Sequence, residues 1–148
     1  MDLRLATYND VPVIKELVLG FYKESPYRDV TLDHTKVDKV IDALLNNDDA
    51  VTVLLTGDEG KVCGIIAGYI SELIFSHDKV ASEAIWYVTP DQRGKQISFK
   101  MVDAFEFWAA KRGCKFVHMS LLADNDRVGK IYKRKGFAEA ETSYLKRI

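Results

Sequence analysis

The stretch from Ala84 to Ser98 constrains the fold of this chain more than any other. It opens with an apolar run rich in β-branched and aromatic residues, which predicts a buried strand ending at Val88. Pro90 interrupts that strand, because proline has no N–H for a ladder bond. From Ile97 the apolar residues recur at helical spacing, so we expect a helix after a short basic turn. The unpaired N–H groups and positive dipole end of such a helix predict a phosphate site.

The composition predicts one domain over residues 1–148. Apolar residues make up 47% and charged residues 29% of the chain, an ordinary globular balance. The net charge of −1 argues against a nucleic-acid or membrane partner, because such proteins usually carry a basic excess. No apolar run approaches the roughly 18 residues of a membrane span, and the N-terminus lacks the form of a signal peptide. Cys63 and Cys114 fit no metal spacing and suit a reducing compartment, so we expect a cytoplasmic protein.

The remaining periodicities predict an α+β order of elements. Helices are expected over about 10–21 and 33–45, from 97 to a stop at Gly113, and from about 126 to Gly136. Strands are expected over 3–6, 50–55, 62–74 and 115–122, besides the one that ends at Val88, with two further extended pieces before Ile148. Residues 22–30 read as a loop, and 57–60 as a hairpin turn.

Two motifs in this order resemble those of the GNAT N-acetyltransferase family. The stretch from Ala84 to Ser98 is similar to the family's acetyl-CoA pyrophosphate loop, with matches at Val88, Pro90, Arg93, Gly94 and Ile97. Gln96 and Ser98 stand where the family usually has glycines. Because φ is negative at a helix N-terminus, neither side chain should strain the backbone, although cofactor binding could be weaker. The second motif places Asn125, Tyr132, Gly136 and Phe137 in the family's register.

The resemblance covers nearly the whole chain and implies the GNAT fold. That fold is α+β, with a central mixed, mostly antiparallel sheet of six to seven strands flanked by about four helices. Within the family, the chain resembles a subgroup of phage and prophage genomes. The stretches that carry this resemblance are 6–7, 21–27, 81–83, and the ending from 136–137 through 144–146.

The resemblance further implies an acetyl-CoA-dependent transfer of an acetyl group to a primary amine of a small molecule or protein, with no metal. GNAT domains often pair, so a homodimer is a further expectation. The implied cofactor-binding residues are Trp86, Tyr87, Val88, Arg93, Gly94, Lys95, Gln96, Ile97, Ser98, Asn125 and Tyr132. Candidates for the adenosine 3′-phosphate are Lys95, Lys130, Lys133 and Arg134. The implied acceptor-side residues are Tyr22, Glu24 and Tyr27.

Two residues are the catalytic candidates. The resemblance makes Tyr132 the acid that protonates the departing thiolate, although a tyrosine on this helix face could also be core packing. Asn125 could likewise be only an N-cap. Glu83 is the candidate base, but in a regular strand it would face away from Val88, five residues on. A β-bulge between them would correct the parity. The alternative bases are Glu72, His77, His118 and Ser120.

Two other classes of function stay open at this point. A GNAT-like domain could bind CoA or a partner without catalysis. A generic phosphate-binding α/β domain would explain the helix N-terminus but not the second motif.

Overall fold

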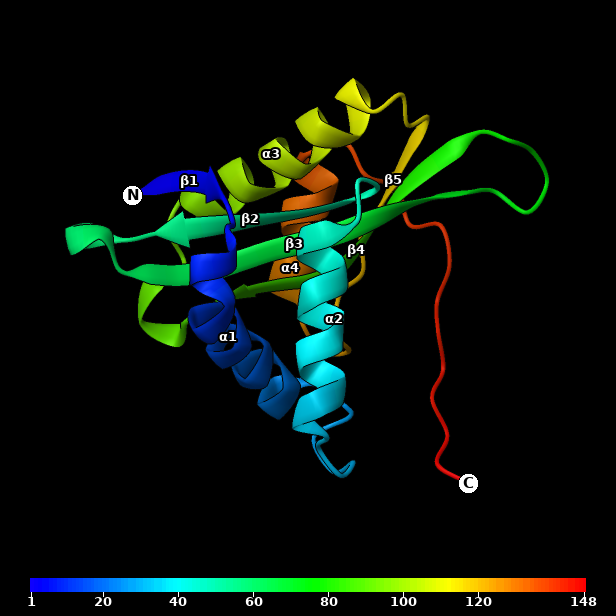
Figure 1. Cartoon of the computed structure of the whole chain (residues 1–148). Coiled ribbons are helices and arrows are strands. Elements are labelled where there is room, and N and C mark those ends of the chain that lie inside the picture. Colours follow the sequence, from blue (N-terminus) through cyan, green and yellow to red (C-terminus); the bar gives the residue numbers. More distant parts are fainter.

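The computed structural model describes residues 1–148 and contains one five-stranded sheet (Figure 1). The sheet order is β1-β2-β3-β4-β5, and every neighbouring pair is antiparallel except β4 and β5. The mixed, mostly antiparallel α+β sheet is therefore confirmed. The elements are β1 (Asp2–Leu5), α1 (Val11–Glu24), α2 (His34–Asn46), β2 (Ala50–Thr56), β3 (Val62–Glu72), β4 (Lys79–Val88), α3 (Ile97–Lys111), β5 (Phe116–His118) and α4 (Asp126–Arg134).

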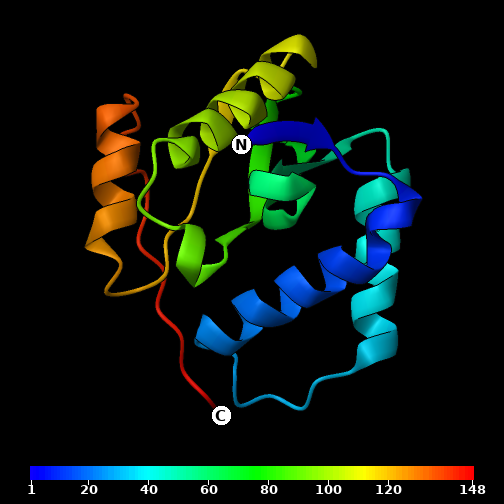
Figure 2. The same cartoon turned by 90° about the vertical axis from the view of Figure 1, so that its left-hand side faces the viewer.

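Helices cover both faces of the sheet. On one face, α1 and α2 bury Ile14 and Ile41 against Ile65 and Ile85 of the central strands. On the other face, α3 packs a second apolar cluster that contains Phe105. The two views show α1 and α2 on one side of the strands and α3 and α4 on the other (Figures 1 and 2). Successive side chains of β3 and β4 point to opposite faces of the sheet and so contribute to both cores, as expected for strands buried on both faces.

The expectation of six to seven strands is wrong, because the last two extended pieces do not join the sheet. Residues 138–148 carry no strand and take part in no backbone hydrogen bond (Figure 1). Tyr144 and Leu145 are exposed there, at 95% and 62%. Charged and small residues dominate the segment, so it offers few apolar side chains that could fix a register against the sheet.

Three element boundaries also differ from expectation. Helix α1 runs on to Glu24, so Tyr22 is helical rather than the start of a loop. The helix ends where Ser25 adopts ψ 162°, because the residue before a proline avoids the helical region. Strands β3 and β5 are shorter than expected, and β5 is only three residues long because it diverges from β4 after the pair Ser82–His118.

Strand β4 contains the bulge that would bring Glu83 to the side of Val88. Ala67 of β3 pairs with Ile85 and Gly68 pairs with Glu83, so Ala84 is an extra residue. One inserted residue reverses the side-chain parity, and Glu83 therefore shares its face with Trp86 and Val88. A Cβ on Gly68 would lie 2.3 Å from the Ser82 carbonyl oxygen, so this position opposite the bulge has room only for glycine.

Candidate active site

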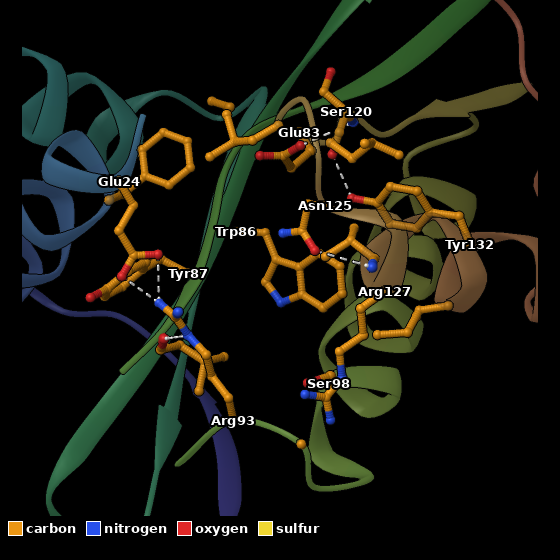
Figure 3. Close-up of a pocket in the computed structure, with 18 residues that line it drawn as sticks. Glu24, Glu83, Trp86, Tyr87, Arg93, Ser98, Ser120, Asn125, Arg127 and Tyr132 are labelled. Carbon is orange, nitrogen blue, oxygen red and sulfur yellow. Dashed lines mark hydrogen bonds and ion pairs between the residues drawn. The ribbon is translucent and has the colours of Figure 1, made fainter. Parts of the chain in front are cut away.

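The divergence of β4 and β5 leaves a cavity of about 430 Å³ along the open edge of β4. Residues of α1, β4, the loop before α3, the segment after β5, and α4 line it (Figure 3). Both motifs of the sequence meet there. The predicted residues that line it are Glu24, Glu83, Trp86, Tyr87, Val88, Arg93, Gly94, Ser98, Asn125 and Tyr132.

The open edge of β4 presents backbone groups to this cavity. The Thr89 N–H donates to the Cys63 carbonyl of β3 at 2.9 Å, so Thr89 directs its backbone groups toward β3. Alternate residues of a strand direct theirs to opposite sides. Trp86 and Val88 therefore direct their N–H groups to the side that β5 has left.

The loop before α3 has the features of a phosphate cradle. The N–H groups of Gly94, Lys95 and Gln96 donate no hydrogen bond within the protein. Gly94 has φ +87°, a conformation that favours glycine, whereas Gln96 has φ −59° as the N-cap of α3. The structure thus agrees with the expectation that Gln96 strains nothing, and the dipole of α3 favours an anion here.

A second cavity, of about 310 Å³, adjoins the first at Gly94 and Ser98 and is basic. Its cations come from the loop and from α4, and they are Lys95, Arg127, Lys130 and Arg134. Lys133, also a candidate, does not line the cavity and instead contacts Glu139 at 3.3 Å.

Arg127 is the functional candidate that the sequence reasoning missed. A Cβ on Gly94 would lie 2.8 Å from its Nη2 atom, so the guanidinium lies directly over the glycine of the loop. Its spacing in the sequence could have identified it. Arg127, Lys130 and Arg134 lie at positions i, i+3 and i+7, so they share one helix face, and the last two were already phosphate candidates.

Glu83 and Tyr132 are joined through the backbone of one residue. The N–H of Ser120 donates to Glu83 Oε2 at 3.2 Å, and its carbonyl accepts from Tyr132 Oη at 2.6 Å (Figure 3). Burial raises the pKa of the half-buried Glu83 to about 7, partly offset by the Ser120 N–H. Burial and, second, the charge of Glu83 raise the pKa of Tyr132 above its usual range. At neutral pH the phenol keeps its proton, while the carboxyl group titrates.

Aromatic rings form the wall beside this pair. The centroid of the Tyr132 ring lies 5.8 Å from that of Trp86 and 5.6 Å from that of Phe137. The Trp86 indole Nε1 is buried without a hydrogen-bond partner. Asn125 is the N-cap of α4, where its side chain accepts from the Val128 N–H at 3.4 Å, and it also lines the cavity. The two interpretations of Asn125 are therefore compatible.

Arg93 connects the phosphate loop to the end of α1. Its Nη2 donates to both carboxylate oxygens of Glu24, at 2.7 and 2.8 Å, and its Nε donates to the Val88 carbonyl at 2.8 Å. The guanidinium also lies over the Tyr87 ring, 5.3 Å from the centroid. A carboxylate at a helix C-terminus is unfavourable with the dipole, and Arg93 compensates for it at Glu24.

Several candidates lie elsewhere. The Tyr22 hydroxyl lies 2.8 and 2.7 Å from the carbonyl oxygens of Arg28 and Val30 and donates its one hydrogen to this pair, which holds the loop after α1. Neither Tyr22 nor Tyr27 lines the cavity. The side chain of Ile97 is buried in the α3 core. Among the alternative bases, only Ser120 lines the cavity; Glu72 and His77 contact each other, and His118 contacts Glu141.

The splayed sheet edge lies beside a helix N-terminus with free N–H groups and nearby cations, an arrangement that favours a bound anion. The sequence matches the model of the acetyltransferase (GNAT) family over residues 15–137. That match spans most of the chain, which therefore belongs to the GNAT acetyltransferase family.

Solved structures show the same fold. A ribosomal-protein-alanine N-acetyltransferase from Brucella melitensis biovar Abortus 2308 is 21% identical, with a TM-score of 0.73 and all of both chains covered. An acetyltransferase from Trypanosoma brucei is 19% identical, with a TM-score of 0.76 and 99% of each chain covered. An aminoglycoside acetyltransferase from an uncultured soil metagenomic sample is 19% identical, with a TM-score of 0.77 and coverage of 99% of this chain and 95% of that chain. No curated protein matches the sequence.

None of the helices combines the length and apolar character needed to cross a bilayer.

Proposed function

We propose that this protein is an acetyl-CoA-dependent N-acetyltransferase that acetylates a primary amine of a small molecule or a protein by direct attack on the thioester. The observation that carries the proposal is that the two cavities adjoin and share lining residues. One offers free amides and four cations for phosphates, and the other offers an open strand edge beside a carboxyl and a phenol. This combination fits CoA, which carries phosphates at one end and a thiol at the other.

The chain's own groups divide the work. Bound acetyl-CoA supplies the acyl group as an activated thioester. The amides of Gly94, Lys95 and Gln96, with Arg127, hold phosphates, while the N–H groups of Trp86 and Val88 orient the ligand along β4 and polarise a carbonyl. Glu83 Oε accepts a proton from the incoming ammonium, directly or through water. Tyr132 Oη holds a proton that it can give to a departing thiolate, since its pKa stays high.

Two measurements test the proposal. Acetyl-CoA should raise the melting temperature, with a stabilisation of about 2.7 kcal/mol at 100-fold excess over Kd. Thiol release should then appear with members of an amine panel. A protein whose melting temperature does not change at millimolar acetyl-CoA would contradict the proposal.

A matched pair of glycine variants localises the site. Gly94→Ala and Gly113→Ala both place alanine at positive φ, of +87° and +76°. Only the first also crowds Arg127, because nothing lies within 4 Å of a Cβ at Gly113. We expect Gly94→Ala to lose acetyl-CoA binding and Gly113→Ala to keep it.

A further inference from the structure

The first cavity has an end that lies away from the basic second cavity. Gly94, Ser98 and Arg127 line both cavities and define the phosphate end. Figure 3 shows Glu83 and Ser120 at the opposite end from Arg93 and Ser98, with Trp86 between them. If the donor extends from the phosphate end along β4, its reactive carbon lies near Glu83, and the amine must reach the same point.

Apolar side chains make up part of the cavity wall. Those of Phe21 of α1, Ala84 of β4, and Leu121 and Leu122 after β5 line it together with Trp86, and Ala84 and Leu121 directly follow Glu83 and Ser120 in the chain. These side chains offer van der Waals contact but no hydrogen-bond acceptor, so they favour an apolar group on the acceptor. The volume of about 430 Å³ must also hold the donor's arm, which leaves room for a small amine or the end of a side chain.

The charge of this end is that of one carboxyl group. Glu24 and Glu83 are the acidic residues that line the cavity. Arg93 donates hydrogen bonds to both carboxylate oxygens of Glu24. It also donates to the Val88 carbonyl and lies over the Tyr87 ring, so it stays beside Glu24. Glu83 accepts one hydrogen bond, from Ser120, and has no cationic partner. One available carboxylate can neutralise one ammonium, and a second ammonium in the cavity would be desolvated without a partner.

We propose, on the basis of the function above, that the acceptor is a primary amine with an apolar substituent and a single positive charge, and that polycations such as polyamines or aminoglycosides are poor acceptors. Glu83 pairs with the one ammonium, and the apolar side chains of Phe21 and Leu121 contact the apolar group. The Glu24–Arg93 pair contributes by removing a carboxylate that would otherwise attract a second cation.

A binding experiment tests the acceptor class without requiring turnover. The full-length protein is saturated with CoA and titrated with hexylamine and with 1,6-diaminohexane, which differ only by a second terminal amine. The reporter is the indole N–H resonance of Trp86 in NMR spectra, and that of Trp108, which does not line the cavity, is the control. We expect the diamine to bind about tenfold or more weakly than hexylamine, because its second ammonium has no partner.

A charge variant should reverse the preference. Leu121 lines the cavity and is 46% exposed, so Leu121→Glu adds a second carboxylate at little risk to the fold. This variant should bind the diamine more tightly than hexylamine. Leu145→Glu, at an exposed leucine of the C-terminal segment, should leave the preference unchanged.

The outcomes separate the two proposals. Tighter binding of the diamine or of kanamycin by the unaltered protein, or an unmoved Trp86 resonance with hexylamine, overturns the acceptor class while CoA binding leaves the proposed function intact. If CoA itself does not bind, the proposed function fails, and the acceptor class fails with it. Weaker diamine binding that Leu121→Glu reverses supports the inference.

Discussion

At the scale of single residues, the environment of Glu83 makes the stability of the fold depend on pH. Its pKa is about 7, against an ordinary value of 4.5. This difference lowers the free energy of unfolding by about 3 kcal/mol at alkaline pH, where the carboxyl group is ionised. The folded state holds this proton more tightly than the unfolded state, so stability is fully present below pH 4.5 and falls as the pH rises through about 7. A buried carboxyl group that titrates near neutral pH thus makes the folded state less stable once it is ionised.

Glu83→Gln should therefore lose activity and gain stability. We expect kcat to fall about 100-fold or more and the limb of the pH–rate profile near pH 7 to disappear. The free energy of unfolding should rise relative to the unaltered protein, with a gain that grows from pH 4 to pH 8 towards about 3 kcal/mol. Denaturant unfolding at several pH values measures this gain. Glu16→Gln, at an exposed carboxylate, is the control; an unchanged rate profile would remove Glu83 as the base.

Tyr132→Phe separates the acid role from packing. Phenylalanine keeps the ring contacts with Trp86 and Phe137 but leaves the Ser120 carbonyl without its donor. We expect a stability loss of about 1 kcal/mol and a fall in kcat of about 100-fold or more. Acetyl-CoA affinity should change little. A variant with full turnover would show that the phenol only packs the core.

At the scale of elements, the bulge of β4 depends on the strand beside it. Gly68 faces the bulge, and a Cβ there would also lie 2.7 Å from the Phe105 ring. The obstacle on the other side is the backbone of Ser82, which cannot rotate away as a side chain can. The position of Glu83 is therefore a property of two strands and a helix together.

Gly68→Ala should destabilise the protein by about 1–3 kcal/mol, because overpacking shifts backbone and side chains. The melting temperature measures the loss, and activity should fall along with it as Glu83 is displaced. Gly57→Ala is the matched control, since its nearest neighbour would be Cys63 Sγ at an ordinary 3.4 Å. Equal melting temperatures of the two variants would contradict the packing argument.

At the scale of the whole molecule, the C-terminal segment makes few contacts with the rest of the fold. Residues 138–148 contribute two exposed ion pairs, Lys133–Glu139 and His118–Glu141, and no ladder bonds. Exposed pairs contribute about 0–1 kcal/mol each. Both cores are closed by other elements.

Truncation after Phe137 should therefore be tolerated. Phe137 stays, so the ring contact with Tyr132 is kept. We expect the melting temperature to fall by no more than about 4 °C, the equivalent of about 1 kcal/mol for a domain of this size. A much larger fall would mean that the segment belongs to the sheet, as the six-to-seven-strand expectation had it. The test is differential scanning calorimetry of the two chains.

The sequence by itself determined the features that neighbouring residues encode. Pro90 ends a strand, Gly94 permits the positive φ of the loop, and Asn125 caps α4, each through interactions within a few residues. These local rules were sufficient for the strand–loop–helix and for the start of α4, whereas the family followed from the resemblance of the two motifs to those of GNAT proteins.

The tertiary structure decided what depends on register and on distant partners. Glu83 reaches the cavity only because β3 and β4 slip by one residue, and Arg93 is bound by a glutamate 69 residues away. Arg127 joins the phosphate end because α4 lies against the loop, whereas Tyr22 is drawn into a loop contact. Such placements follow from the packing of whole elements, because a side chain's partner across a fold is set by the fit of two surfaces rather than by its neighbours in the chain.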